Sequence, residues 1–127
     1  MDSTKPRDWL YKAKQDLESS WILLQNDGPE ETIAFHAHQA IEKAMKAYII
    51  FKTGELVEGH SLVYLNKLAA KQNNKFEKFK SDCVELNKYY LRTRYPIDMS
   101  YEVAYEDAKT AYEKANEIYK LVKEEIN

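Results

Sequence analysis

The stretch TIAFHAHQAIEKAMKAYIIFK, residues 32–52, determines the fold more than any other part of this sequence. Its apolar residues recur at steps of three and four, which is the spacing of one face of an α-helix. Many of them are alanine, and such small side chains allow neighbouring helices to approach closely. Acidic residues at Glu30 and Glu31 favour a helix start. We therefore expect a central helix from Glu30 to Thr53, followed by a loop from Gly54 to Gly59.

A helix is expected on each side of this central one. Before it, apolar residues at helical spacing run from Trp9 to Leu24, and Ser3 or Thr4 is expected to cap the start, with Pro6 in the first turn. The turn NDGP ends this helix at residues 26–29, where Gly28 suits a left-handed conformation.

Three more helices are expected after the loop. A short one covers residues 60–71, and a fourth runs from Phe76 to Tyr95, where Pro96 ends it. The last is capped by Asp98 or Ser100, and it carries an apolar stripe from Tyr101 to Ile126 with an alanine-and-tyrosine face that is a candidate interface. The sequence thus predicts a single all-α domain over residues 1–127, an up-and-down bundle of four main antiparallel helices plus one short helix.

The composition excludes several classes of protein. The net charge of −2 argues against attraction of nucleic acid or an anionic membrane to the whole surface, although a local basic cleft is compatible with it. Cys83 is the single cysteine, so there is no intramolecular disulfide and no zinc-finger spacing. The polar N-terminus resembles no secretory signal, and no apolar run is long enough to span a membrane. We expect a cytoplasmic protein.

A polar stripe crosses the expected central helix. His36, Gln39, Lys43 and Lys46 are three, four and three residues apart and therefore share one face, while His38 and Glu42 form a second stripe beside it. Two interpretations are open: these side chains satisfy one another at the edge of the core, with lysine reaching water, or they line a binding site. A metal site is not expected, because His38 and Glu42 have no convincing third or fourth ligand.

The stretch YYLRTRYPID, residues 89–98, contains two of the three arginines of the chain. We call residues 92–96 the arginine turn. Arginine binds phosphate or carboxylate with a planar fork and stacks on aromatic rings, which lysine does not do. Arg92 and Arg94 either stabilise the end of a helix and pair with nearby acids, or they bind an anionic ligand together with Tyr95. No glycine-rich phosphate loop, nucleophile elbow or metalloprotease motif is present, so side chains must bind any phosphate.

The sequence resembles the HEPN domain family, the higher eukaryotes and prokaryotes nucleotide-binding proteins. The resemblance extends over nearly the whole chain, in the expected order. It rests on DWLYKAKQDLESSWILL at 8–24, AFHAHQAIEKAMKAYI at 34–49, GHSLVYL at 59–65 and LRTRYP at 91–96, followed by an alanine-rich last helix.

This resemblance implies a helical bundle, commonly a homodimer, with a nucleotide or RNA cleft beside the arginine turn. It also implies a small nucleotidyltransferase as partner, in some cases within a toxin–antitoxin pair. No cofactor is implied. Some members of the family are metal-independent ribonucleases, in which an arginine and a following histidine at the start of the last helix contact the scissile phosphate and transfer protons.

The chain departs from that ribonuclease motif because no histidine follows His60. Tyr101 lies where the histidine would fall at the longest spacing from Arg94, and a tyrosine, with a reference pKa near 10, is a poor base at neutral pH. Arg94 and Tyr101 would be catalytic only in a ribonuclease of altered type. His36 would replace the histidine only if the fold brings it beside the arginines.

Three hypotheses follow. The first is a HEPN protein that binds a nucleotide or RNA phosphate and pairs with a nucleotidyltransferase, with a ligand site formed by six residues: Arg92, Arg94, Tyr95, His36, Gln39 and Lys43. The second is a ribonuclease with an altered catalytic set. The third is a structural dimeric interaction module, in which the arginines only stabilise the fold.

Overall fold

The structure of the chain, a computed structural model, describes residues 2–92, 96 and 103–127, with the side chains of residues 91 and 92 left out. Every regular element among these residues is a helix, as the sequence predicts. In chain order the elements are α1 (Pro6–Gln25), α2 (Glu30–Thr53), α3 (Leu62–Gln72), the 3₁₀ helix η1 (Asn74–Phe79), α4 (Lys80–Asn87), α5 (Tyr89–Arg92) and α6 (Tyr105–Ile126).

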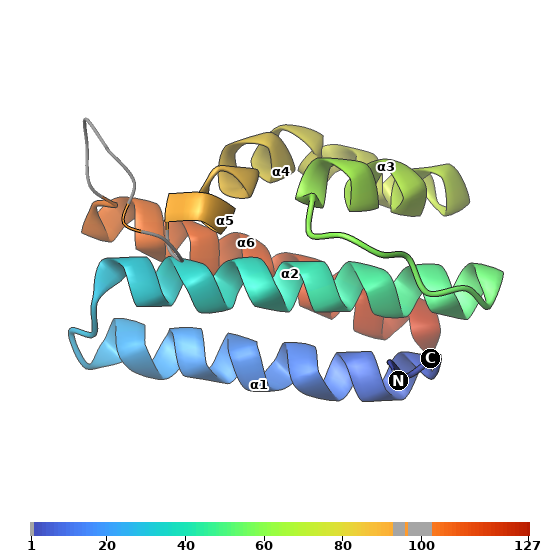
Figure 1. Ribbon diagram of the computed structural model, residues 1–127, viewed down its shortest axis with the longest axis horizontal. Helices are drawn as coiled ribbons and strands as arrows, with labels where there is room; N and C mark the ends of the chain where they lie inside the picture. Colours follow the sequence, from blue (N-terminus) through green and yellow to red (C-terminus); the bar gives the residue numbers. More distant parts are fainter. Residues whose placement is uncertain (1, 93–95, 97–102) are drawn as a thin grey trace.

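Helix α2 is at the centre of the bundle (Figure 1). It packs along α1 on one side and along α6 on another, and α3 and α5 also contact it. The segment after α2 turns back along the helix, so that α3 begins over its middle (Figure 1). The chain then reverses through α4 and α5 before α6, which confirms the predicted up-and-down bundle of four main helices and one short one.

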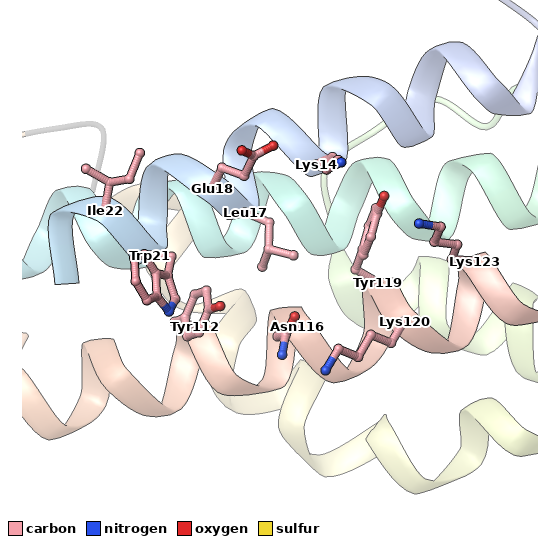
Figure 2. A pocket seen from close by; sticks show the side chains of 10 residues that line it. All are labelled: Lys14, Leu17, Glu18, Trp21, Ile22, Tyr112, Asn116, Tyr119, Lys120 and Lys123. Carbon is pink, nitrogen blue, oxygen red and sulfur yellow. The ribbon is translucent and has the colours of Figure 1, made fainter. Parts of the chain in front are cut away.

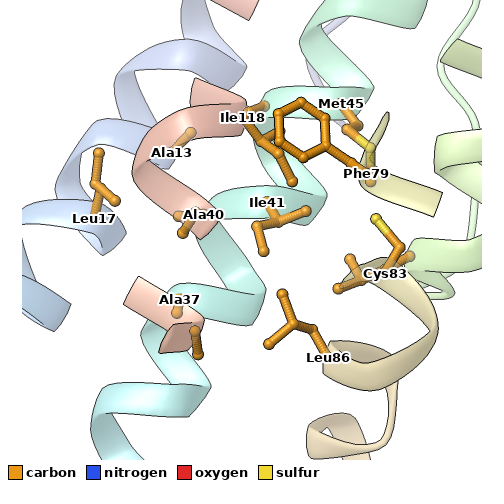
Figure 3. Close-up of a cluster of buried hydrophobic side chains, with 14 of the residues drawn as sticks. Ala13, Leu17, Ala37, Ala40, Ile41, Met45, Phe79, Cys83, Leu86 and Ile118 are labelled. Atoms are coloured by element: carbon orange, nitrogen blue, oxygen red, sulfur yellow. The ribbon is translucent and has the colours of Figure 1, made fainter. Parts of the chain in front are cut away.

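The alanines of α2 allow this close packing. Ala37, Ala40 and Ala44 are completely buried, and Figure 3 shows Ala37 and Ala40 beside the α6 ribbon, with α1 close by. On α6, Ala108, Ala111 and Ala115 are also buried. The sequence predicted an interface at the alanines and tyrosines of the last helix. For the alanines this prediction is wrong, because they belong to the core between α6 and α2.

The expected fourth helix, residues 76–95, is divided into η1, α4 and α5 over its described part. Asn73 caps the first piece, since its side-chain oxygen accepts a hydrogen bond from the Lys75 N–H at 3.0 Å. Residues i and i+3 eclipse in a 3₁₀ helix, so Phe76 and Phe79 both enter the core. The apolar spacing predicted a helix here correctly, but it did not distinguish a 3₁₀ turn from an α-helical one.

The expected cap of the first helix differs from the structure. Lys5 precedes α1, and no side chain caps this helix, although Pro6 is at its first position as predicted. Ser3 instead accepts a hydrogen bond from the Lys5 N–H and donates one to Asp8. Asp98, Ser100 and Tyr101 lie outside the described residues.

The turn between α1 and α2 differs from the prediction in one residue. Asp27, not Gly28, has a positive φ of 56°, which aspartate tolerates better than most residues do. Gly28 is needed for space, because a Cβ there would lie 2.7 Å from Leu23 Cδ2 and 3.1 Å from the Leu23 carbonyl oxygen.

Among the described residues no helix is both long enough and apolar enough to cross a membrane.

Replacing Gly28 with alanine is predicted to lower the free energy of unfolding by about 1–3 kcal/mol, because the added methyl overlaps Leu23. The matched change Asp27→Gly removes the positive-φ side chain and should change stability by less than about 1 kcal/mol. Urea denaturation of both variants checks this. A stable Gly28→Ala variant together with a destabilised Asp27→Gly variant would contradict the conclusion that Gly28 is needed for its close approach to Leu23.

Candidate functional site

A small pocket lies between the start of α3 and the short helix α5. It is lined by His60, Ser61, Asn87, Lys88 and Tyr90 and has a volume of about 360 Å³. Tyr90 belongs to α5, whose last residue, Arg92, begins the arginine turn. The pocket therefore includes a residue, Tyr90, that comes two positions before Arg92 in the sequence. Arg94, Tyr95 and Tyr101 lie outside the described residues.

The buried carboxylate of Glu42 lies next to this pocket. Glu42 is only 4% exposed, and a buried carboxylate is costly unless it is paired. Lys46, one helical turn later on α2, donates to its Oε2 at 3.2 Å. His60 Nδ1 lies 3.0 Å from Oε2 and 3.1 Å from Oε1. His38 Nδ1 is 4.0 Å from Oε1. Glu42 thus connects α2 to the segment that precedes α3.

The imidazole of His60 is oriented by this carboxylate. A carboxylate accepts hydrogen bonds, so His60 Nδ1 carries the hydrogen that is shared with Glu42. The ring stacks on Tyr90 with centroids 4.9 Å apart and planes 20° from parallel. Its side chain is 52% exposed. Within the part of the chain that the structure describes, no group hydrogen-bonds to Nε2.

The other lining residues hold the start of α3 in place. Asn87 Oδ1 accepts the Leu62 N–H at 2.8 Å, and Ser61 Oγ accepts the Tyr64 N–H at 3.2 Å as the helix cap. These bonds satisfy two of the N–H groups that a helix start leaves without partners. Because α4 and α3 are connected in this way, the position of His60 relative to Tyr90 is well defined.

A second polar cluster lies between α1 and α2. Asp16 binds His36 Nδ1 at 2.9 Å and Lys43 Nζ at 2.5 Å. Burial by itself raises the pKa of Asp16, but the hydrogen bonds from His36 and Lys43 outweigh it, and the pKa lies below its ordinary value. Asp16 was not predicted from the sequence, because no local spacing connects it to α2.

The two polar clusters are neighbours on the surface of α2. At 100° per residue, Gln39 and Lys46 fall between the His36–Lys43 stripe and the His38–Glu42 stripe. Lys46 also lies over the Trp9 ring of α1, 5.5 Å from its centroid. The predicted residues His36, Gln39 and Lys43 thus belong to one polar band on α2. None of these residues lines the pocket beside α5, and only Glu42 is connected to it, through its hydrogen bond with His60.

Metal ligation receives no support from the geometry. Among the described residues there is no group of three or more histidine, cysteine, aspartate or glutamate side chains that could hold an ion. Glu42 and His60, whose pairing was not predicted from the sequence, are instead tied by a direct hydrogen bond. The signals for them were the one-turn spacing of Glu42 and Lys46 and the position of His60 just before the third helix.

A separate, more apolar groove of about 500 Å³ lies between α1 and α6 (Figure 2). Trp21 and Ile22 from α1 and Tyr112 and Tyr119 from α6 line it. Trp21 is 47% exposed. Glu18 is on the α1 rim, and lysines lie on both rims, at positions 14, 120 and 123.

Comparison with known proteins gives a consistent family. A model of the HEPN domain matches residues 6–126. The solved structure of TT1696 from Thermus thermophilus is similar, with 28% identity, a TM-score of 0.85, and 96% of this chain and 98% of that chain covered. The structure of ST0689, an archaeal HEPN homologue, has 28% identity and a TM-score of 0.77, with both chains fully covered. A search of curated proteins gave no match.

Replacing Asp16 with asparagine is predicted to lower stability by about 1–3 kcal/mol at neutral pH, because Lys43 loses its charged partner. The folded-state pKa of Asp16 lies below the ordinary value, so this contribution is present above the unfolded pKa and is lost as pH falls through the folded pKa. Urea denaturation at several pH values should show the gap to wild type narrowing below about pH 4. The exposed control Glu113→Gln on α6 should change stability by less than about 0.5 kcal/mol. A stability difference between wild type and Asp16→Asn that stays constant with pH would contradict the pairing of Asp16 with His36 and Lys43.

Proposed function

This chain belongs to the HEPN domain family, and on that premise we propose that it binds the phosphate of a nucleotide or of RNA at the pocket beside the arginine turn. The observation that carries the proposal is the exposed His60 ring, held by Glu42 and stacked on Tyr90, in a pocket directly before Arg92. An oriented imidazole and an aromatic face are groups that proteins use to contact phosphates and bases.

The chemistry of the surrounding residues supports an anionic ligand. Lys88 lines the pocket, and Arg92 and Arg94 add two guanidinium groups within the next six residues of sequence. Arginine pairs with phosphate through two parallel hydrogen bonds, which gives geometric specificity as well as charge. The polar band of α2, with His36, Gln39 and Lys43, belongs to this proposal as a second contact for the ligand outside the pocket, since none of the three lines it.

The proposed partners follow from the family resemblance. A small nucleotidyltransferase is the protein partner that we propose, and a toxin–antitoxin pair in the cytoplasm is the setting in which such a binding protein would act. Both proposals, the nucleotidyltransferase partner and the toxin–antitoxin pair, rest on the family and not on a contact among the described residues. Co-purification of the two proteins from cells is the test.

A second copy of the chain is the other partner that we propose, with the groove between α1 and α6 as its contact surface. Trp21 and Ile22 are large apolar side chains that remain exposed, and such side chains together commonly mark protein contacts. Glu18 on the α1 rim, next to Lys14, and Lys120 and Lys123 on the α6 rim are groups of opposite charge. In a two-fold contact the acidic part of one copy can therefore face the basic part of the other.

Changing Arg92 or Arg94 to alanine is predicted to remove ligand binding at the arginine turn. Arg7, the third arginine, is exposed in the first turn of α1, so Arg7→Ala is the matched control. Thermal shifts with nucleoside mono-, di- and triphosphates and with a short RNA measure binding. A ligand at a hundred times its dissociation constant should add about 2.7 kcal/mol to wild type and to the control only.

The same thermal-shift titration distinguishes ligand binding from the hypothesis of a purely structural interaction module. If no ligand stabilises wild type while Arg92→Ala or Arg94→Ala melts early, the arginines only hold the turn, and the chain is a structural interaction module. If all three variants respond to RNA like wild type, the ligand binds elsewhere. Binding at the arginine turn should also weaken as salt rises, because phosphate contacts release counterions.

Replacing Trp21 with alanine is predicted to weaken self-association more than ten-fold, because an interfacial tryptophan commonly contributes about 2 kcal/mol or more. Sedimentation equilibrium over a range of concentrations gives the dimer dissociation constant. Tyr64→Ala removes a comparably exposed aromatic side chain from α3 and should leave the constant unchanged. Equal effects of both changes, or a monomeric wild type, would exclude this interface.

A further inference from the structure

We propose that a groove between α3 and the segment formed by η1 and the start of α4 is a docking site for an acidic amphipathic helix of a partner protein. We call it the α3 groove, and it has a volume of about 520 Å³. It shares no lining residue with the pocket beside α5 or with the groove between α1 and α6. The proposal therefore goes beyond the phosphate site and the contact between two copies.

The α3 groove lies on an outer face of the bundle. Helices α3 and α4 are on the side of α2 away from α1 (Figure 1), and η1 contacts α3. The core-facing side chains of α3 include Leu62, Leu65 and Ala69, which are buried. Val63, on the groove, is 40% exposed. Two packed helical segments with an open groove between them provide a surface on which a third helix can lie.

Three lysines surround this groove. Lys67 and Lys71 come from α3, and Lys80 is the first residue of α4; Glu77 is the acidic side chain that also lines it. Within the residues that the structure describes, none of the three lysines forms an ion pair, whereas Lys75 is paired with a carboxylate of α6 at 3.0 Å. Lys67 and Lys71 are one helical turn apart, where like charges destabilise a helix. A carboxylate placed between them would offset this repulsion.

The positive charge is confined to this part of the chain. Residues 62–80 contain five lysines and one acidic residue, whereas the whole chain has a net charge of −2. The remainder of the protein is therefore net acidic and repels an acidic partner. Complementary charge steers association and selects the orientation of a partner more than it sets affinity. An acidic segment is thus directed to the α3 groove and away from other surfaces.

The floor of the groove combines apolar and polar groups. Val63 and Ala70 provide apolar surface. Asn66 is 3% exposed, and its Nδ2 donates a hydrogen bond to the Phe76 carbonyl oxygen at 3.0 Å, which joins α3 to η1. Among the described residues no group donates to Asn66 Oδ1. An amphipathic helix offers apolar side chains to this floor and can donate a polar side chain to that oxygen, which a simple anion cannot do.

The spacing of the lysines matches a helical partner. One turn of a helix rises about 5.4 Å, so carboxylates at positions i and i+4 of a partner helix can each meet one of Lys67 and Lys71. Lys80 belongs to the other wall of the groove and is placed for a third carboxylate. Helix α3 has 11 residues and is about 16 Å long. A partner helix of about three turns would cover it.

Nucleic acid suits this groove less well than an acidic helix does. Among the described residues, those that line the groove include no arginine and no aromatic side chain. Arginine is preferred where phosphate is bound in two places at once, and bases of single strands stack on aromatic rings. Lysine is a point charge on a flexible stem and pairs with carboxylates without that geometry. The composition of the lining therefore favours carboxylates as the groups to be bound.

The test measures binding of a synthetic acidic helix to the full-length protein by fluorescence anisotropy. The labelled probe peptide has about four turns, with glutamates at i and i+4 along one face and leucines beside them. Lys67→Gln with Lys71→Gln keeps helix propensity and should weaken binding more than about ten-fold, because two charge contacts are lost. The matched control, Lys12→Gln with Lys109→Gln, removes the same charge from exposed positions on α1 and α6. It should weaken binding less than about three-fold, since distant exposed charges are screened.

A second variant and a second peptide make the test specific. Val63→Glu adds a carboxylate at an exposed groove position and should also weaken binding of the probe. A peptide of the same composition, with its glutamates distributed around the helix, should bind more weakly to wild type than the probe does. Circular dichroism of each variant checks that the helical fold is retained.

The possible results decide the proposal. Weaker binding in both groove variants, with the control close to wild type, supports the α3 groove as the docking site. No binding of the probe to wild type, equal binding of the two peptides, or equal effects of the two double variants overturns it. A short RNA that loses binding in Lys67→Gln with Lys71→Gln, but not in the control, would overturn it as well, because the groove would then bind nucleic acid.

Discussion

The buried carboxylate of Glu42 is the constraint around which the contact between the middle of α2 and the start of α3 is arranged. A carboxylate that is almost completely removed from water requires charged or hydrogen-bonding partners. Lys46 supplies one from the next turn of α2, but the second, His60, comes from eighteen residues further along the chain. To bring it there, the segment after α2 must turn back along the helix (Figure 1). The start of α3 and the contact with Tyr90 depend on that return.

Such a pair is not required for a stable helical bundle. Replacing a buried ion pair with apolar residues of similar size is often neutral or stabilising, and the core of α2 is elsewhere formed by alanine, isoleucine and methionine. The fold alone therefore does not explain why charge is retained at this position. An orienting role for Glu42 does explain it, because the carboxylate holds an exposed imidazole next to the arginine turn. Asp16 has a comparable position on the other side of α2, where it joins His36 and Lys43 to α1.

Much of the fold follows from local rules. The bounds of α2 were predicted from its alanine-rich stripe and its flanking glycine, since both signals act within a few residues. The turn at Asp27 and Gly28 was predicted only in part, because a positive φ and a close approach to Leu23 both favour glycine, and sequence does not say which applies. The division of the fourth helix depends on how Phe76 and Phe79 enter the core, and this is decided by tertiary packing.

The site was less predictable than the fold for a physical reason. Side chains one helical turn apart, such as Glu42 and Lys46, are recognisable from spacing. The contacts of His60 with Glu42 and of Asp16 with His36 join residues that are far apart in the sequence, and their pairing depends on the path of the chain. The polar band on α2 was therefore predictable, but the contact of His60 with Glu42 was not.

The most direct test of this account is an NMR titration of the isotope-labelled protein with a 2′-O-methyl RNA oligonucleotide. Backbone and imidazole chemical shifts should change first and most at His60, Asn87 and Tyr90, and the His60 ring signals should move with the same dissociation constant. Shift changes confined to the groove of Trp21 and Tyr119, or no changes at saturating RNA, would contradict it. In that case the cluster around Glu42 only connects the helices.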